Sequence, residues 1–112
     1  MENRVRLQGR LSDIRQRWTP DGSAAVIASL WVTRPDLGPQ RAQVVDEQPM
    51  PLRATGEMAE WLATQEEQML HIEGCLRRRY YSRDGEQRWG QVEIWVDACR
   101  PLKNKQLGEK DE

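Results

Sequence analysis

The chain has 112 residues, of which 38% are hydrophobic and 31% are charged, and its formal net charge is −1. This length fits one domain with a modest core, and interspersed charges of both signs are typical of a globular chain. No stretch approaches the roughly 18 consecutive apolar residues of a membrane helix, and the first residues lack the apolar run of a signal peptide. We therefore expect a cytoplasmic protein that does not bind a membrane.

Residue types that serve catalysis or metal binding are scarce. Cys75 and Cys99 are too few for a disulfide framework or a zinc site, and we interpret them as reduced thiols. The single histidine, His71, lies in an apolar-alternating run, where a solvated strand position is expected. Without a second histidine or a cysteine cluster, a nucleophile or a metal has no partners. The sequence therefore predicts no cofactor and no enzymatic activity.

The first third of the chain predicts two strands joined by a tight turn. Residues 5–11 alternate between apolar and polar side chains, and the strand is expected to continue to Trp18. Gly9, on the core-facing side, indicates a bend or bulge. The Pro-Asp-Gly sequence at residues 20–22 predicts the turn. Residues 26–33 then alternate again and predict the second strand.

The middle of the chain predicts a loop, a broken strand and a helix. Two prolines and a glycine indicate a loop at residues 34–39. We interpret residues 41–45 and 50–55 as two parts of a third strand, which the prolines restrict to a bulged or edge position. Residues 57–65 form the only helical pattern, in which Trp61 faces the core.

A long hairpin ends the predicted domain. Asp84-Gly85 is a strong signal for a hairpin turn between a strand beginning at Leu70 and a return strand. We expect the return strand to expose Glu93. The predicted core of the whole domain consists of Val5, Leu7, Val26, Leu30, Leu70, Ile72, Leu76, Val92 and Ile94.

The order of three strands, a short helix and two strands is the arrangement of an OB-fold, with the helix closing one end of a five-stranded barrel. The fold class is therefore all-β with one short helix. We place this domain at residues 1–101 and a flexible charged tail at residues 102–112.

Arginines and aromatic residues recur at outward positions of the predicted strands. OB-folds bind single-stranded nucleic acid with a basic groove and aromatic platforms, so this pairing predicts a binding surface. The candidate residues are Arg4, Arg6, Arg10, Arg15, Arg17, Trp31, Arg77, Arg79, Tyr80, Tyr81 and Trp89. All three lysines lie in the tail, so every other basic side chain is a planar guanidinium suited to phosphate contacts.

Protein contacts are the alternative interpretation of the outward aromatic residues. Trp18, Trp31 and Trp95 have the side chains that anchor subunit interfaces. A proline-broken strand also leaves an edge that another chain can cover. We therefore expect a homodimer or homotetramer. The chain could also be a protein-interaction OB module of a primosome-like assembly with weak nucleic-acid binding.

Four segments resemble the bacterial single-stranded DNA-binding protein family, which includes the related primosomal replication protein N. Residues 3–11 resemble its opening Asn-Lys-Val-x-Leu-x-Gly-x-Leu, and residues 17–22 its Arg-aromatic-x-Pro-Asn-Gly turn. Residues 56–60 resemble its Gly-Lys-Leu-Ala-Glu. Residues 72–79 resemble its Ile-Glu-Gly-x-Leu-Arg-x-Arg, which an Asp-Gly hairpin tip follows here.

The resemblance implies an oligomeric OB-fold that binds single-stranded DNA, or RNA as the alternative, in replication, recombination or repair. Proteins of replication restart or recombination are the implied partners. The family's aromatic after the Arg-x-Arg motif corresponds to Tyr81. Its stacking positions in the third strand fall on Pro49 and Thr55, and Trp31 is the nearest substitute for its loop aromatic.

Overall fold

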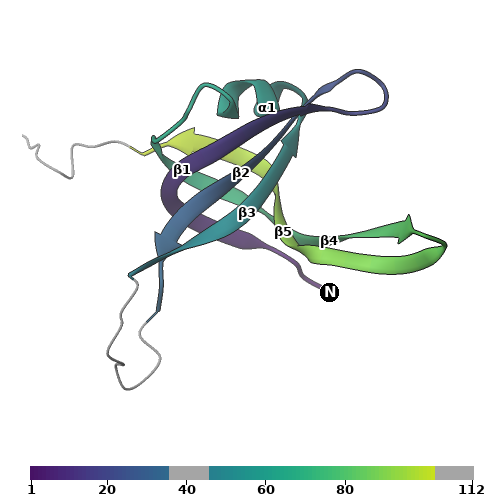
Figure 1. The fold of residues 1–112 in the computed structure, drawn as a ribbon. Coiled ribbons are helices and arrows are strands. Elements are labelled where there is room, and N and C mark those ends of the chain that lie inside the picture. Colours follow the sequence, from purple (N-terminus) through teal and green to yellow (C-terminus); the bar gives the residue numbers. More distant parts are fainter. Residues whose placement is uncertain (36–45, 103–112) are drawn as a thin grey trace, which may run out of the picture.

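Five strands and one short helix make up the computed structural model, which describes residues 1–35 and 46–102. The elements are β1 (Val5–Trp18), β2 (Ala24–Thr33), β3 (Glu47–Thr55), α1 (Gly56–Leu62), β4 (Met69–Arg83) and β5 (Glu86–Pro101). The strands close into a barrel in the order β1-β2-β3-β5-β4, and α1 lies at one end of it (Figure 1). The predicted fold class, a five-stranded barrel with one short helix, is confirmed.

Two parts of the sequence predictions lie outside the described residues. They are the first part of the third strand with most of the preceding loop, at residues 36–45, and the tail from residue 103 onward. Within the described residues, no helix is long and apolar enough to cross a membrane.

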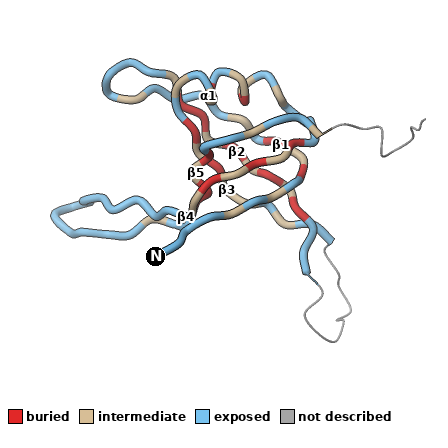
Figure 2. Tube along the Cα trace, turned by 180° about the vertical axis from the view of Figure 1, so that it is seen from behind, coloured by how far each residue is buried: buried red, intermediate tan, exposed pale blue. Residues whose placement is uncertain are grey.

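The core fills the barrel with alternate residues of all five strands. Leu11, Leu30, Leu70, Ile72 and Ile94 are at most 1% exposed. Figure 2 shows the buried positions gathered in the barrel and beneath α1. Of the predicted core residues, Val26 is also buried, and Val5 and Leu7 pack against the core while partly exposed. The register of β4 is confirmed, because Leu70 and Ile72 point inward while His71 and Glu73 do not.

Two glycines let neighbouring strands approach closely. A Cβ at Gly9 would collide with the carbonyl oxygen of Trp31, and one at Gly74 would collide with that of Trp95. The bulge of β1 lies beyond Gly9, between Ser12 and Arg15, where Asp13 has a φ of 58°. The absence of a side chain at Gly9 therefore allows β1 and β2 to approach closely. The bend that was expected at Gly9 occurs a few residues later.

The prolines of β3 do not break the strand. β3 runs without interruption from Glu47 to Thr55 and pairs with β2 over its whole length. It pairs with β5 only at Leu52 and Arg53, so Pro49 and Pro51 lie where β3 has a single neighbour. The edge position expected from the prolines is confirmed for this part of the strand, but the predicted break is wrong.

The helix is shorter than the predicted residues 57–65. α1 ends at Leu62, because Thr64 closes a tighter turn in which its N–H and its hydroxyl both donate to the carbonyl of Trp61. Ala59 and Leu62 are buried against the barrel, and Trp61 packs on the core as expected. The helix thus closes one end of the barrel.

Replacing Gly56 with alanine should lower the free energy of unfolding by about 1 kcal/mol. Gly56 has a φ of +70° at the start of α1, and an added Cβ would have nothing within 4 Å, so the cost is conformational rather than steric. Urea unfolding would measure it. Gly90→Ala is the control variant, because an added Cβ at Gly90 makes only ordinary contacts at 3.5 Å or more. Equal stability of both variants would contradict the prediction.

Candidate nucleic-acid interface

The end of the β4–β5 hairpin leaves the barrel as a two-stranded arm, which we define as residues 76–92. β4 pairs with β1 only as far as Gly74 opposite Val5, and the side-chain amide of Asn3 then exchanges two 2.8 Å hydrogen bonds with the backbone of Leu76. At the tip, Asp84 and Gly85 have φ values of 52° and 79°, as the predicted Asp-Gly turn requires. The arm and the β1–β2 loop project on the same side of the barrel (Figures 1 and 2).

Two core predictions are wrong because of this arm. Leu76 is 44% exposed and Val92 is 47% exposed. Both side chains lie on the side of their strand that faces the core where the strand runs within the barrel. Leu76 lies directly opposite the buried Ile94, so the barrel ends at this pair. Alternation correctly predicts which side of a strand faces inward, but it does not show where the strand leaves the barrel.

One face of the arm is strongly basic, and we call it the outer face because it continues the outside of the barrel. It carries Arg77, Arg79, Tyr81, Arg83 and Arg88, as the pairing of β4 with β5 requires. Tyr81 is 36% exposed, and the guanidinium of Arg79 lies 6.0 Å from its ring centroid. Within the described residues, only Arg88 of these arginines has a carboxylate partner, Glu86 at 2.8 Å. The outer face therefore combines uncompensated positive charge with an exposed aromatic ring.

The outer face continues across the barrel as a row of aligned positions. Trp95 on β5 is opposite Arg53 on β3, Arg53 is opposite Ile27 on β2, and Ile27 is opposite Arg15 on β1. The guanidinium of Arg77 lies 4.4 Å from the ring centroid of Trp95, which joins this row to the arm. A band thus runs from Tyr81 to Arg15 near the β1–β2 loop.

The charge of Arg53 in this band is compensated. Its Nε and Nη2 atoms donate to both carboxylate oxygens of Glu93 at 3.0–3.3 Å. Glu93 is only 5% exposed, so the prediction that it faces solvent is wrong. It does point outward, opposite Arg77, but Arg53 covers it. The ion pair between Arg53 and Glu93 therefore connects β3 to β5 at the base of the arm.

The opposite face of the arm is apolar. Tyr80 is 57% exposed and Trp89 60% exposed, and they lie opposite each other with ring centroids 4.7 Å apart. Leu76 and Val92 continue this face toward the barrel, and Arg78 is its only arginine. The guanidinium of Arg78 lies over Trp89 at 5.8 Å and donates to the carbonyl of Gly90. The predicted site residues Tyr80 and Trp89 are therefore separated from Tyr81 by the thickness of the arm.

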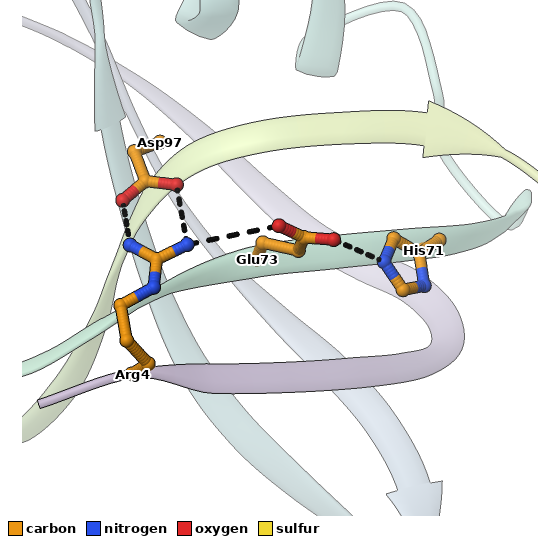
Figure 3. Close-up of polar contacts among 4 residues, drawn as sticks. All are labelled: Arg4, His71, Glu73 and Asp97. Carbon is orange, nitrogen blue, oxygen red and sulfur yellow. Dashed lines mark hydrogen bonds and ion pairs between the residues drawn. The ribbon is translucent and has the colours of Figure 1, made fainter.

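Arg4 takes part in a polar network on the outside of β1, β4 and β5 (Figure 3). Its guanidinium donates to both oxygens of Asp97 and lies 3.6 Å from Glu73, which accepts a 2.9 Å hydrogen bond from His71. That hydrogen bond, with Arg6 and Arg4 nearby, holds the pKa of the Glu73 carboxyl below its usual value. His71 is thus largely covered, at 12% side-chain exposure, and its predicted solvated position is wrong.

Arg10 and Trp31 form a second cluster away from the arm. The indole N–H of Trp31 donates to the Ser12 hydroxyl at 2.8 Å, and Arg10 lies 5.8 Å from the ring centroid. Arg10 also pairs with Glu67 at 3.0 Å and Glu47 at 3.5 Å. Trp31 is therefore fixed against β1 beside a neutralised arginine.

The structure thus divides the predicted site residues into groups. Arg77, Arg79 and Tyr81 lie together on the outer face, and Arg15 lies at the far end of the same band. Arg17 is exposed near the β1–β2 loop and donates to the backbone of Gln16 at 2.9 Å. Arg6 lies beside Glu73, in the network of Arg4. Arg4, Arg6 and Arg10 are therefore all close to carboxylates.

Several residues of the band and the outer face were not among the predicted site residues, namely Arg53, Ile27, Arg83 and Arg88. Trp95 was not among them either, although its side chain was expected to be exposed. For Arg53 the signal was present, since it alternates with the buried Leu52 and Ala54. The proline-rich sequence around it concealed that pattern. No family model matches the chain, and no curated protein matches it.

Proposed function

We propose that this chain binds single-stranded DNA without sequence preference, through the outer face of the arm and the band that continues it. The proposal depends chiefly on one observation, the juxtaposition of Tyr81 with Arg77, Arg79 and Arg83. These arginines have no carboxylate partner among the described residues. Arginine neutralises phosphates, and an exposed ring stacks on any base, so neither contact depends on sequence.

Several features favour a single strand over a duplex. Stacking on Tyr81 requires an unpaired base with a free face, which the stacked bases of a duplex do not offer. The band leads from the arm toward the β1–β2 loop, along the side on which OB-folds bind oligonucleotides. The resemblance to the single-stranded DNA-binding family supports a role in replication, recombination or repair, and binding rather than catalysis.

Titration of labelled oligo-dT at several salt concentrations tests the proposal. Three neutralised phosphates predict a slope of about −2 for log K against log salt, because each contributes about 0.7 on a single strand. A mixed-sequence strand of equal length should bind with similar affinity, and a duplex more weakly. Absence of binding, or affinity independent of salt, would contradict the proposal and favour the protein-interaction alternative.

A further inference from the structure

Trp95 lies in the middle of the band, between the arm and β3. It alternates on β5 with Ile94 and Val96, which are 1% and 5% exposed, so its ring points away from the core. The ring is partly exposed, and the guanidinium of Arg77 lies over it, 4.4 Å from the ring centroid. The other arginines that lie over rings in the described part of the chain are 5.8–6.0 Å away. Trp95 is therefore an outward aromatic ring that an arginine covers closely.

Neither side chain of the Arg77–Trp95 pair has another polar partner among the described residues. Glu93 is opposite Arg77 in the strand register, but both of its carboxylate oxygens accept hydrogen bonds from Arg53. The indole N–H of Trp95 donates to no other described residue. Because Arg77 is also exposed, its guanidinium can leave the ring without breaking an ion pair or a hydrogen bond.

Trp31 is also covered by an arginine, but its surroundings hold both side chains in place. The indole N–H of Trp31 donates to the hydroxyl of Ser12, and the arginine over its ring, Arg10, pairs with Glu67 and Glu47. Arg10 would have to break these ion pairs to reach a phosphate. The two tryptophans therefore differ in how firmly the covering arginine is held, and of the two only Trp95 lies in the band.

We propose that Trp95 is a second stacking platform for the single strand, and that binding exchanges the Arg77 guanidinium on its ring for a base. Arg77 then moves from the ring to a phosphate. A cation–π contact at an exposed site is weak, whereas a stacked base and a neutralised phosphate together contribute more, so the exchange is favourable. This inference rests on the proposed function and specifies how the middle of the band takes part in it.

The rings of Tyr81 and Trp95 are too far apart to stack on the same base. Trp95 is opposite Cys75, and Tyr81 lies six residues beyond Cys75 on β4, which corresponds to roughly 20 Å at about 3.3 Å per residue. Each ring therefore takes a different base of one strand. Substitutions at sites this far apart act independently, so their losses in affinity should multiply.

Titration of an oligo-dT of about 15 nucleotides, near the upper end of OB-fold site sizes, tests the platform in variants of the chain. Trp95→Leu keeps an apolar side chain but removes the aromatic face, so it should weaken binding about 5- to 150-fold without changing the salt slope. Combining it with Tyr81→Ala should give the product of the two single losses. Trp31→Leu is the matched control and should keep both affinity and slope.

Two further variants test the exchange and do not depend on the stability of Trp95→Leu. Arg77→Met should reduce the salt slope by about 0.7, because Arg77 reaches one phosphate in the complex. Trp95→Tyr should bind as the unaltered chain does, but oligo-dT should quench its tryptophan fluorescence less, because the indole that stacks on a base is missing.

Failure of this inference and failure of the proposed function give different results. If Tyr81→Ala weakens binding but Trp95→Leu does not, the proposed function stands and Trp95 is not a platform. Equal losses in Trp95→Leu and Trp31→Leu, or equal quenching in Trp95→Tyr and the unaltered chain, would also overturn the platform. An unchanged salt slope in Arg77→Met would overturn the exchange. An unaltered chain that does not bind oligo-dT would overturn the proposed function itself.

Discussion

Replacing Tyr81 with alanine should weaken oligo-dT binding by about 1–3 kcal/mol, or about 5- to 150-fold in Kd, and leave its salt dependence nearly unchanged. Stacking of a base on the exposed ring releases no counterions, so the loss should be the same at low and high salt. Fluorescence anisotropy at several salt concentrations measures both quantities.

Tyr81→Trp is the conservative control for this prediction. It should bind at least as well as the unaltered chain, because a stacking platform requires only an aromatic face. Affinity that survives Tyr81→Ala would remove the outer face of the arm from the proposed interface. A change in the mass of the particle with unchanged affinity would assign Tyr81 to a contact between subunits.

Replacing Glu93 with alanine should cost about 3 kcal/mol of unfolding free energy, because it leaves the charge of Arg53 unpaired in a covered position. The lower end of the usual range applies, since the Arg53 side chain keeps 17% of its surface exposed. Urea unfolding at neutral pH measures the loss.

The double variant Arg53→Met with Glu93→Leu distinguishes charge pairing from packing. Apolar side chains of similar volume often replace a buried ion pair with little loss of stability, so the double variant should recover most of the free energy. If it is as unstable as Glu93→Ala alone, the ion pair is not the cause of the loss. Recovery would show that the base of the arm tolerates any well-packed pair.

The sequence predicts the barrel well because period-two alternation records which side of each strand faces inward. Val26, Leu30, Leu70, Ile72 and Ile94 are all buried as expected. Alternation is a local property, however, and does not show how far a strand stays beside its neighbours. Leu76 and Val92 have the inward direction but lie beyond the last strand that could cover them, so both are exposed.

The candidate site could be predicted only in part, because charge compensation depends on contacts between distant residues. Arg4 and Arg79 are both outward arginines in the sequence. The structure brings Asp97 to Arg4 across 93 positions of the chain. Arg79 instead lies over the ring of Tyr81 and has no carboxylate partner among the described residues. Likewise, Tyr80 and Tyr81 are neighbours in sequence, but the pleat of β4 places them on opposite faces of the arm. Both distinctions require the register of the strands.

Comparing Arg79→Ala with Arg10→Ala in salt-dependent oligo-dT titrations tests most directly which arginines form the interface. Arg79 has no carboxylate partner among the described residues, whereas Arg10 is paired with Glu67 and Glu47. We expect Arg79→Ala to weaken binding to every sequence and to reduce the salt slope by about 0.7, the value for one phosphate on a single strand. Arg10→Ala should leave affinity and slope unchanged. An unchanged slope for Arg79→Ala together with a reduced slope for Arg10→Ala would contradict the assignment of the interface to the arm.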